Sequence, residues 1–164
     1  MMFRLLKRGY SKRDYCTGTD KAMFTLHSQL AADTILVGDL PLSTVLLSKD
    51  ANYPWCILVP RRVDIREIHH LEVLDQQQLL LESCALAAAM EALFEPVKMN
   101  IAALGNQVPQ LHIHHIARFA DDAAWPRPVW DQVPSIAYSE PLLVKRIEGL
   151  RKHLLEADLR VEAV

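Results

Sequence analysis

The sequence predicts an α+β fold, in which a five-stranded antiparallel sheet carries one long helix packed on it and a C-terminal helix. Three observations lead to this prediction. β-branched and aliphatic runs separated by short turns fill the chain between residues 34 and 59, and such runs are typical of strands. Residues 76–94 are rich in Leu, Ala and Glu without Gly or Pro, which favours a long helix. Two more strand-like runs follow, and antiparallel strands with segregated helices indicate the α+β class.

The first half of the chain is expected to supply three strands. Leu40-Pro41-Leu42 lies between two aliphatic runs and reads as a hairpin turn. Asp50, Asn52 and Pro54 supply the chemistry of a second turn, and the continuous apolar run after it is typical of a central strand. We therefore expect, in order, a short amphipathic helix at 24–33, strands at 34–39 and 43–48, a turn at 49–54 and a strand at 55–59.

The second half is expected to hold the long helix and the remaining strands. Asp75 and Gln78 have the spacing of a capping box, and the helix that follows is expected to be core. Pro141, two residues after Ser139, fits the first turn of a helix. We expect a connector at 63–74 with a helical turn near 65–70, a helix at 76–94, strands at 98–104 and 110–118 around a tight loop at 105–109, a loop at 121–134 and a last helix to about residue 157.

Composition bounds the organisation and the partners. A chain of 164 residues is long enough for one domain with a real core. The net charge of −2 gives no indication of nucleic-acid or membrane binding, and three widely spaced cysteines without a CxxC pair favour a reduced, cytoplasmic setting. Residues 1–22 form a basic extension expected to be poorly ordered, residues 23–135 the main domain, and residues 136–164 the C-terminal helix.

The most informative stretch is the predicted strand from Gln110 onward. Side chains alternate between the two faces of a strand, so Gln110, His112 and His114 share one face, and His115 lies on the other. The histidines could be metal ligands, structural residues or catalytic groups. Gly105, just upstream, suits a tight turn that aims backbone N–H groups at an anion. A glycine turn beside paired imidazoles favours phosphate chemistry with a histidine nucleophile.

The run from Gly105 through Val108, Gln110-Leu-His-Ile-His114 and Arg118 resembles the histidine-triad (HIT-like) superfamily. The family's apolar strand ending in Pro and basic residues is matched by the segment 57–62, and its Asn ahead of the histidines by Asn100. The resemblance covers roughly residues 24–130 and departs from the pattern in having Gln110 at the first triad position. It implies a HIT-like fold, a homodimer, and a bacterial protein related to dinucleoside polyphosphate hydrolases.

The resemblance also implies a mechanism. His112 would attack the α-phosphorus of a nucleotide and form a covalent nucleotidyl-histidine that water hydrolyses. His114 would bind the phosphate or the leaving group, and Gln110 could donate to a phosphate oxygen but cannot titrate. The expected donors to the phosphoryl oxygens are Asn100, Gly105, Asn106 and Gln107.

The substrate class implied is nucleoside phosphoramidates, dinucleoside polyphosphates or similar conjugates. A nucleotidyl transferase or phosphorylase, and a weakly active nucleotide-binding module, stay open as alternatives. No protein-bound metal or cofactor is expected, although a divalent metal could accompany the substrate's phosphates.

Other polar residues have a structural interpretation beside the functional one. Asp50 and Asn52 could bind ribose hydroxyls, or they serve the turn alone. Arg61 and Arg62 could attract phosphate or end the strand in solvent. For His115 a half-buried or dimer-facing position is favoured over catalysis. The pair His69-His70 is interpreted as solvated. Trp125 and Trp130 could lie at the nucleotide or at a subunit interface, and the sequence does not choose between these positions.

Overall fold

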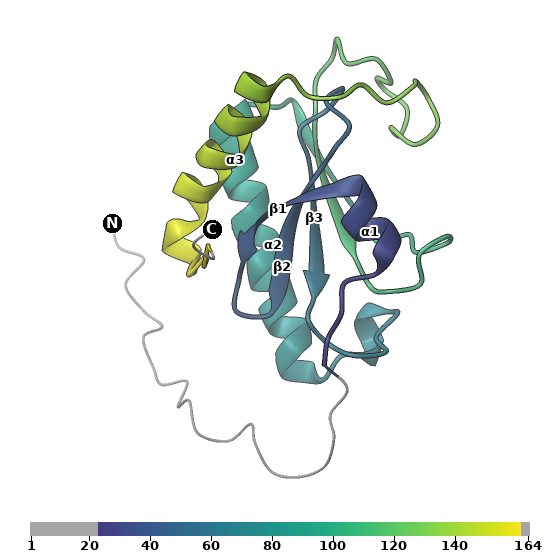
Figure 1. Ribbon diagram of the computed structural model, residues 1–164, viewed down its shortest axis with the longest axis vertical. Coiled ribbons are helices and arrows are strands. Elements are labelled where there is room, and N and C mark those ends of the chain that lie inside the picture. The colour runs from purple at the N-terminus through teal and green to yellow at the C-terminus, as the bar shows by residue number, and fades with distance from the viewer. Residues whose placement is uncertain (1–22, 162–164) are drawn as a thin grey trace.

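A computed structural model describes residues 23–161 of the chain. The basic extension expected at residues 1–22 lies outside the described residues. Within them the α+β prediction is confirmed, because five antiparallel strands and three α-helices follow one another in the expected order (Figure 1). The strands are β1 (Thr34–Asp39), β2 (Ser43–Ser48), β3 (Trp55–Pro60), β4 (Lys98–Ala102) and β5 (Ile113–Arg118).

The sheet has the order β1-β2-β3-β5-β4, which makes β1 and β4 its edges. β5 lies in the interior between β3 and β4, with His114 opposite Ile57 on one side and Ala102 on the other. Strands in the interior of a sheet have both edges paired, so their side chains are held in a fixed register. The histidine-bearing strand is therefore one of the most constrained elements of the protein.

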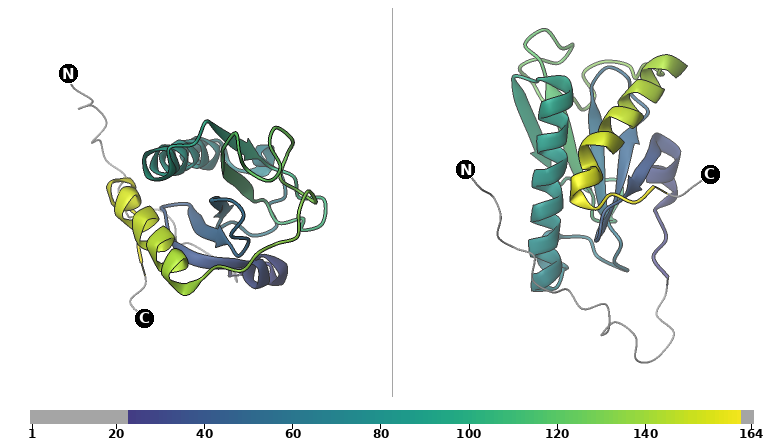
Figure 2. Two further views of the ribbon diagram at one scale, coloured as in Figure 1. Left: turned by 90° about the horizontal axis from the view of Figure 1, so that it is seen from above. Right: turned by 90° about the vertical axis from the view of Figure 1, so that its left-hand side faces the viewer.

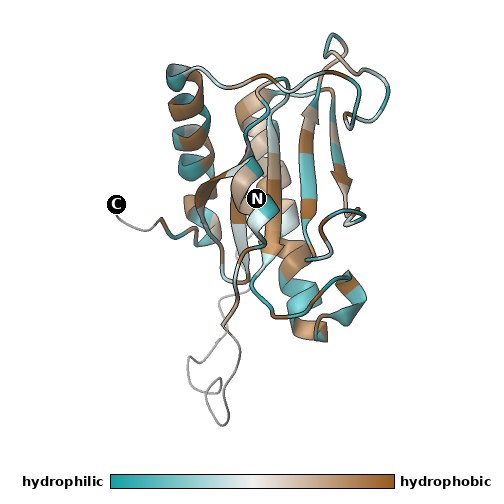
Figure 3. Cartoon of the chain, turned by 45° about the vertical axis from the view of Figure 1, so that its right-hand side comes forward, coloured by the Kyte–Doolittle hydropathy of each residue, from teal (hydrophilic) through white to brown (hydrophobic). Residues whose placement is uncertain are grey.

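Two helices cover one face of the sheet, α2 (Val73–Phe94) and α3 (Glu140–Leu154) (Figure 2). Their apolar residues, such as Leu86 and Leu150, pack with Leu58 and Ile113 of the sheet in the main core. Polar and apolar segments alternate along α3, as expected for a helix with one buried side (Figure 3). α2 is only partly the core helix predicted, because Leu80 and Leu81 are each 65% exposed.

The opposite face of the sheet carries shorter segments and two smaller apolar clusters. Helix α1 (Ser28–Asp33) places Leu30 against Ile57 and Val59 of β3. The long loop after β5 places Val129 and Trp130 beside Trp55, Tyr53 and Ile116. Two 3₁₀ turns complete the fold, η1 (Ile68–His70) and η2 (Leu155–Ala157). Because the face is covered only in part, it can expose functional side chains.

The histidine strand is shorter than predicted. It begins at Ile113 and not at Gln110, and β4 ends at Ala102 and not at Leu104. The reason is a hydrogen bond outside the sheet, since the Leu111 N–H donates to the Ile65 carbonyl at 2.9 Å. This bond pulls the segment before β5 away from β4 and toward the connector, which widens the tight loop expected at 105–109.

The long helix starts earlier than predicted, at Val73, and the capping box at Asp75 is wrong. Glu72 holds the N-cap position without a side-chain hydrogen bond to the backbone. The Asp75 carboxylate instead accepts two hydrogen bonds from Arg62, at 2.5 and 2.7 Å. A planar guanidinium paired with a carboxylate in this two-bond geometry is stronger than a neutral cap. The ion pair thus ties the end of β3 to the first turn of α2.

Candidate functional site

The two histidines His112 and His114 lie together on the sheet face away from α2 and α3. Their ring centroids are 4.8 Å apart with nearly perpendicular planes. Each side chain is buried, with 7% of the residue exposed. The shared face predicted from strand alternation is therefore present, even though His112 itself precedes β5.

The orientation of the His112 ring follows from one hydrogen bond. Its Nδ1 lies 2.7 Å from the Gln110 carbonyl oxygen. A carbonyl only accepts, so Nδ1 carries the hydrogen and, in the neutral ring, Nε2 carries the lone pair. A neutral imidazole with Nε2 unprotonated can act as a nucleophile or as a base.

A small crevice lies beside this ring. Gly105 has a φ of +71°, the left-handed turn for which glycine is favoured. Asn106 and Gln107 follow it and are exposed on the same loop. The lining includes two charged residues that the sequence did not single out, Arg66 and Glu67, and consists of Arg66, Glu67, Ala103, Leu104, Gly105, Gln110, Leu111 and His112.

Gln110, at the first triad position, has its side chain committed to the chain's N-terminal segment. Its Oε1 accepts from the His27 N–H and its Nε2 donates to the Thr25 carbonyl, both at 2.9 Å. The side-chain amide thus accepts from one backbone N–H and donates to one backbone carbonyl, as a peptide group of a neighbouring strand would. The side chain fixes residues 25–27 next to the crevice, and the phosphate contact expected of it stays a prediction.

His114 is enclosed by two tryptophans. The Trp55 indole Nε1 donates to His114 Nδ1 at 3.0 Å, and Trp130 lies edge-on to both rings, with centroids 5.4 Å from His114 and 5.6 Å from Trp55. Burial, together with the neighbouring His112 and His115, lowers the pKa of His114 to about 4. His114 is therefore neutral at neutral pH.

A buried arginine links the site to the loop that carries Trp130. Arg118 is 1% exposed and forms a two-bond ion pair with Asp122, at 2.7 and 3.0 Å. Its Nη1 also donates to Asn100 Oδ1 at 2.8 Å, and its guanidinium lies 5.7 Å from the centre of the Trp125 ring. Asp122 in turn accepts the N–H groups of the residues that begin the loop.

Asp50 and Asn52 are used in the turn between β2 and β3. Asp50 Oδ1 accepts from the backbone and side-chain nitrogens of Asn52 and from the Ile136 N–H. Asn52 also donates to the Pro134 carbonyl at 3.0 Å. These bonds fasten the end of the long loop to the hairpin, and ribose binding by the two residues stays a prediction.

The other histidines and the arginines after β3 occupy structural positions. His115 is fully buried under α2 and bonded to Ser83 at 2.7 Å, so the half-buried or dimer-facing position expected for it is wrong. Arg61 donates to the Leu40 carbonyl at 2.7 Å, and Arg62 is paired with Asp75 as described above. His69 and His70 are both exposed, as expected of a solvated pair.

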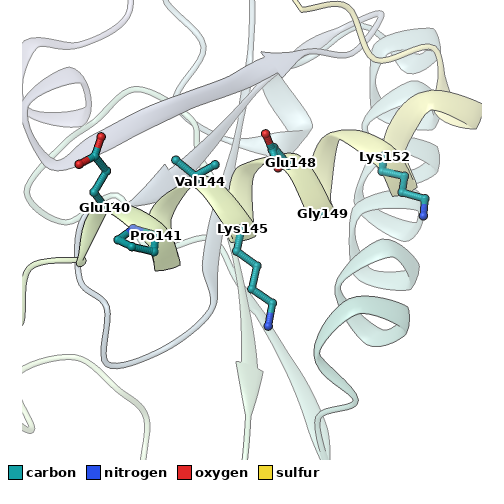
Figure 4. A pocket seen from close by; sticks show the side chains of 7 residues that line it. All are labelled: Glu140, Pro141, Val144, Lys145, Glu148, Gly149 and Lys152. Carbon is teal, nitrogen blue, oxygen red and sulfur yellow. The ribbon is translucent and has the colours of Figure 1, made fainter.

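Other features of the described chain offer no rival site. No cluster of three or more His, Cys, Asp or Glu side chains within residues 23–161 has the geometry to hold a metal ion. No helix in that range is long and apolar enough to cross a membrane. A second, wide hollow faces solvent on one helix only (Figure 4). It is lined by Glu140, Pro141, Val144, Lys145, Glu148, Gly149 and Lys152 of α3.

Comparison with known proteins finds a matching family model and similar solved structures. Residues 29–121 match the family model described as HIT domain. The chain is similar to a histidine triad protein from Bradyrhizobium japonicum, with 50% identity, coverage of 80% of this chain and 98% of that one, and a TM-score of 0.80.

Two further structures are similar to the same degree. A histidine triad protein from Marinobacter aquaeolei VT8 has 49% identity, covers 83% of this chain with 99% of its own, and gives a TM-score of 0.80. A histidine triad protein from Sinorhizobium meliloti 1021 has 40% identity, the alignment covers 80% of this chain and 97% of that one, and the TM-score is 0.78. No curated protein matches the sequence.

Proposed function

The chain belongs to the HIT domain family, whose members are generally nucleotide hydrolases or transferases, and we propose that this protein is a nucleotide hydrolase with His112 as its nucleophile. The substrates would be nucleotidyl conjugates, either phosphoramidates or dinucleoside polyphosphates. The reaction would pass through a covalent nucleotidyl-histidine. This splits one difficult displacement at phosphorus into two easier ones.

The observation that carries this proposal is the orientation of His112. The Gln110 carbonyl holds its Nδ1–H at 2.7 Å, which leaves the lone pair on Nε2. When Nε2 attacks phosphorus, the ring becomes positively charged. The same carbonyl then stabilises that charge through a stronger, charge-assisted hydrogen bond. His112 is thus oriented before substrate arrives, which lowers the cost of reaching the transition state.

Donors to the phosphoryl oxygens are expected on two sides of His112. Asn100 shares the sheet face of the histidines, because it pairs with Ile116 across β4 and β5. Arg118 binds its oxygen, so the amide nitrogen of Asn100 is the end left to donate. From the other side, the backbone of Gly105 and Asn106 and the side chain of Gln107 would contribute. Such preorganised donors stabilise negative charge without reorganisation.

The test is intact-protein mass spectrometry after brief mixing with an adenosine phosphoramidate or diadenosine polyphosphate. Quenching at neutral to alkaline pH preserves the acid-labile phosphorus–nitrogen bond. We expect a transient mass increase of one adenylyl group in the native protein and none in His112→Ala. His69→Ala, which alters an exposed imidazole outside the site, is the matched control and should form the adduct normally.

The outcomes separate the alternatives. An adduct that persists in water but resolves when phosphate or a sugar phosphate is added indicates a transferase. Absence of both adduct and product, with nucleotide binding retained, indicates a binding module and contradicts the proposal. Thermal unfolding of His112→Ala should match that of the native protein, since a large loss of stability would make the residue structural.

We further propose that the protein is a homodimer that associates through α2 and β4. α2 contacts β5 and α3 contacts β1, so the flank of α2 away from α3 lies toward the β4 edge. Leu81 of α2 and Ile101 of β4 are 65% and 50% exposed, and an unpaired edge strand beside apolar surface is suited to a two-fold interface.

The oligomeric state is measured by light scattering during size-exclusion chromatography. Leu81→Glu/Ile101→Glu should shift a dimer to a monomer, whereas Val144→Glu on the exposed side of α3 should not. A native protein that is monomeric at all concentrations would refute the proposal.

The two described cysteines, Cys56 and Cys84, are unpaired, which supports the reduced, cytoplasmic setting expected from the sequence.

A further inference from the structure

The hydrogen bond between Trp55 and His114 determines which proton His114 can offer. An indole N–H is a donor only. Because Trp55 donates to Nδ1 of His114 at 3.0 Å, that nitrogen must hold a lone pair. The neutral ring therefore carries its hydrogen on Nε2. Trp130, edge-on at 5.4 Å, encloses the same ring.

The same contact opposes protonation of His114. A charged imidazole has hydrogens on both nitrogens, so Nδ1–H would face the Trp55 N–H, and two donors would meet without an acceptor. Burial acts in the same direction, because only 7% of the residue is exposed to water. With the pKa lowered to about 4, the neutral donor is the only form populated at neutral pH.

The other polar groups of the site are bonded to protein partners or exposed to solvent. Gln110 does not ionise, and its amide is bonded to residues 25–27. His112 uses its one hydrogen on the Gln110 carbonyl. His115 lies on the far face of the sheet against Ser83. Among the residues lining the crevice, Glu67 is the single carboxylate, and its side chain is exposed to solvent.

We propose that Trp55 is a positioning residue that fixes His114 as a neutral Nε2–H donor, and that the site therefore cleaves nucleotides whose leaving group departs as a phosphate anion. This proposal rests on the function proposed above and chooses between its substrate classes. Phosphoanhydrides, such as dinucleoside polyphosphates, have such leaving groups. Phosphoramidates of alkyl amines do not.

The balance of each step gives the reason. In an anhydride, the lone pair of His112 Nε2 forms the new P–N bond, the P–O bond breaks, and its electron pair departs on a phosphate oxygen that needs no proton. In a phosphoramidate the breaking P–N bond leaves its pair on an amine nitrogen, which departs readily only when protonated. Water then attacks the adduct, the P–Nε2 bond breaks, His112 regains its lone pair, and one proton passes to solvent.

The positioning part is tested without substrate by ¹⁵N NMR of the full-length protein labelled at histidine. His114→Asn identifies the signals of His114. We expect Nε2 protonated and Nδ1 unprotonated from pH 5.5 to 8. Trp55→Phe keeps an aromatic side chain but removes the N–H donor, so the two tautomers of His114 should mix, while burial still holds its pKa low. Trp125→Phe, in the loop but on Arg118, should leave the His114 signals unchanged. A native His114 protonated on Nδ1 would overturn the proposal.

The substrate preference is tested by comparing kcat/KM for a diadenosine polyphosphate with that for an alkyl-amine adenosine phosphoramidate. We expect the anhydride to be favoured at least a hundredfold. In Trp55→Phe, kcat for the anhydride should fall with KM within about twofold, and the preference should narrow because the Nδ1–H tautomer of His114 offers no hydrogen to the departing phosphate. Equal rates, or a faster phosphoramidate, in the native protein would overturn the preference. Absence of turnover and adduct with both substrates would refute the proposed hydrolase itself, while the NMR result would stand independently.

Discussion

Acid should destabilise this protein through a histidine that takes no part in the site. His115 is fully buried beneath α2. Its Nδ1 donates to the Ile113 carbonyl at 3.2 Å, so its Nε2 accepts from the Ser83 hydroxyl at 2.7 Å. Burial penalises the charged ring and lowers the pKa of His115 to about 4, although its two hydrogen bonds oppose the shift.

The sign and size follow from proton linkage. Between pH 4 and 6.5 the unfolded chain binds a proton at this position and the folded protein does not, so unfolding is favoured by acid. The contribution is complete above the unfolded pKa of 6.5 and is lost as the pH falls toward 4. At pH 5 the difference corresponds to about 2 kcal/mol of lost stability. His114, whose pKa is also lowered to about 4, should add a similar loss.

The assay is urea unfolding followed by circular dichroism at pH 7 and pH 5. The variant Ser83→Ala/His115→Leu removes the buried imidazole together with the Ser83 hydroxyl, so that hydroxyl is not left unpaired. We expect its stability to fall by about 2 kcal/mol less than that of the native protein over this interval. His69→Leu, which removes an exposed ring, should show the native pH dependence. An identical loss in the native protein and the double variant would refute the argument.

Two further predictions concern the segments that frame the site and the sheet edge. Gln110→Ala removes both hydrogen bonds to residues 25–27. Hydrogen exchange should show the His27 amide exchanging at least tenfold faster than in Gln132→Ala, which alters an exposed side chain and is the control. Unchanged exchange would mean that other contacts hold this segment. Gly38→Ala would place a Cβ 2.6 Å from the Arg160 carbonyl oxygen, and thermal unfolding should show a loss of about 1–3 kcal/mol, whereas a neutral result would mean that residues 159–161 move aside at no cost.

The sheet could be predicted from the sequence because its signals are local. The runs that form β1, β2 and β3 have the expected bounds to within one residue, since their aliphatic patterns end at turn-forming residues. The start of β5 could not be predicted, because it depends on the bond from Leu111 to Ile65, which lies far away in the sequence. The start of α2 differs from the prediction for a similar reason, because the Asp75 carboxylate accepts hydrogen bonds from Arg62 and does not cap the helix.

The site was predictable only as far as strand alternation reaches. His112 and His114 were expected on one face and lie there 4.8 Å apart. Trp55 was interpreted only as part of a central strand, yet a signal existed, because a buried indole N–H requires an acceptor. The pairing of Arg118 with Asp122 also had a sequence signal, because two opposite charges lie four residues apart at the end of a buried strand. Their pairing with Asn100 depends on the β4–β5 register, which local patterns do not fix.

The three triad positions are each held by a different part of the chain, and this arrangement concentrates the chemistry on one atom. Gln110 is bonded to the N-terminal segment, His112 to the carbonyl of Gln110, and His114 to Trp55 of the neighbouring strand. Of the ring hydrogens of His112 and His114, that on His112 Nδ1 points at a protein acceptor, and that on His114 Nε2 has none among the described residues. Among the four ring nitrogens of His112 and His114, only His112 Nε2 carries a lone pair without a hydrogen-bond partner in the described residues. A site built this way gains preorganisation and loses the ability to exchange protons. Its reactivity should therefore follow the stability of the departing group more closely than the pH of the solution.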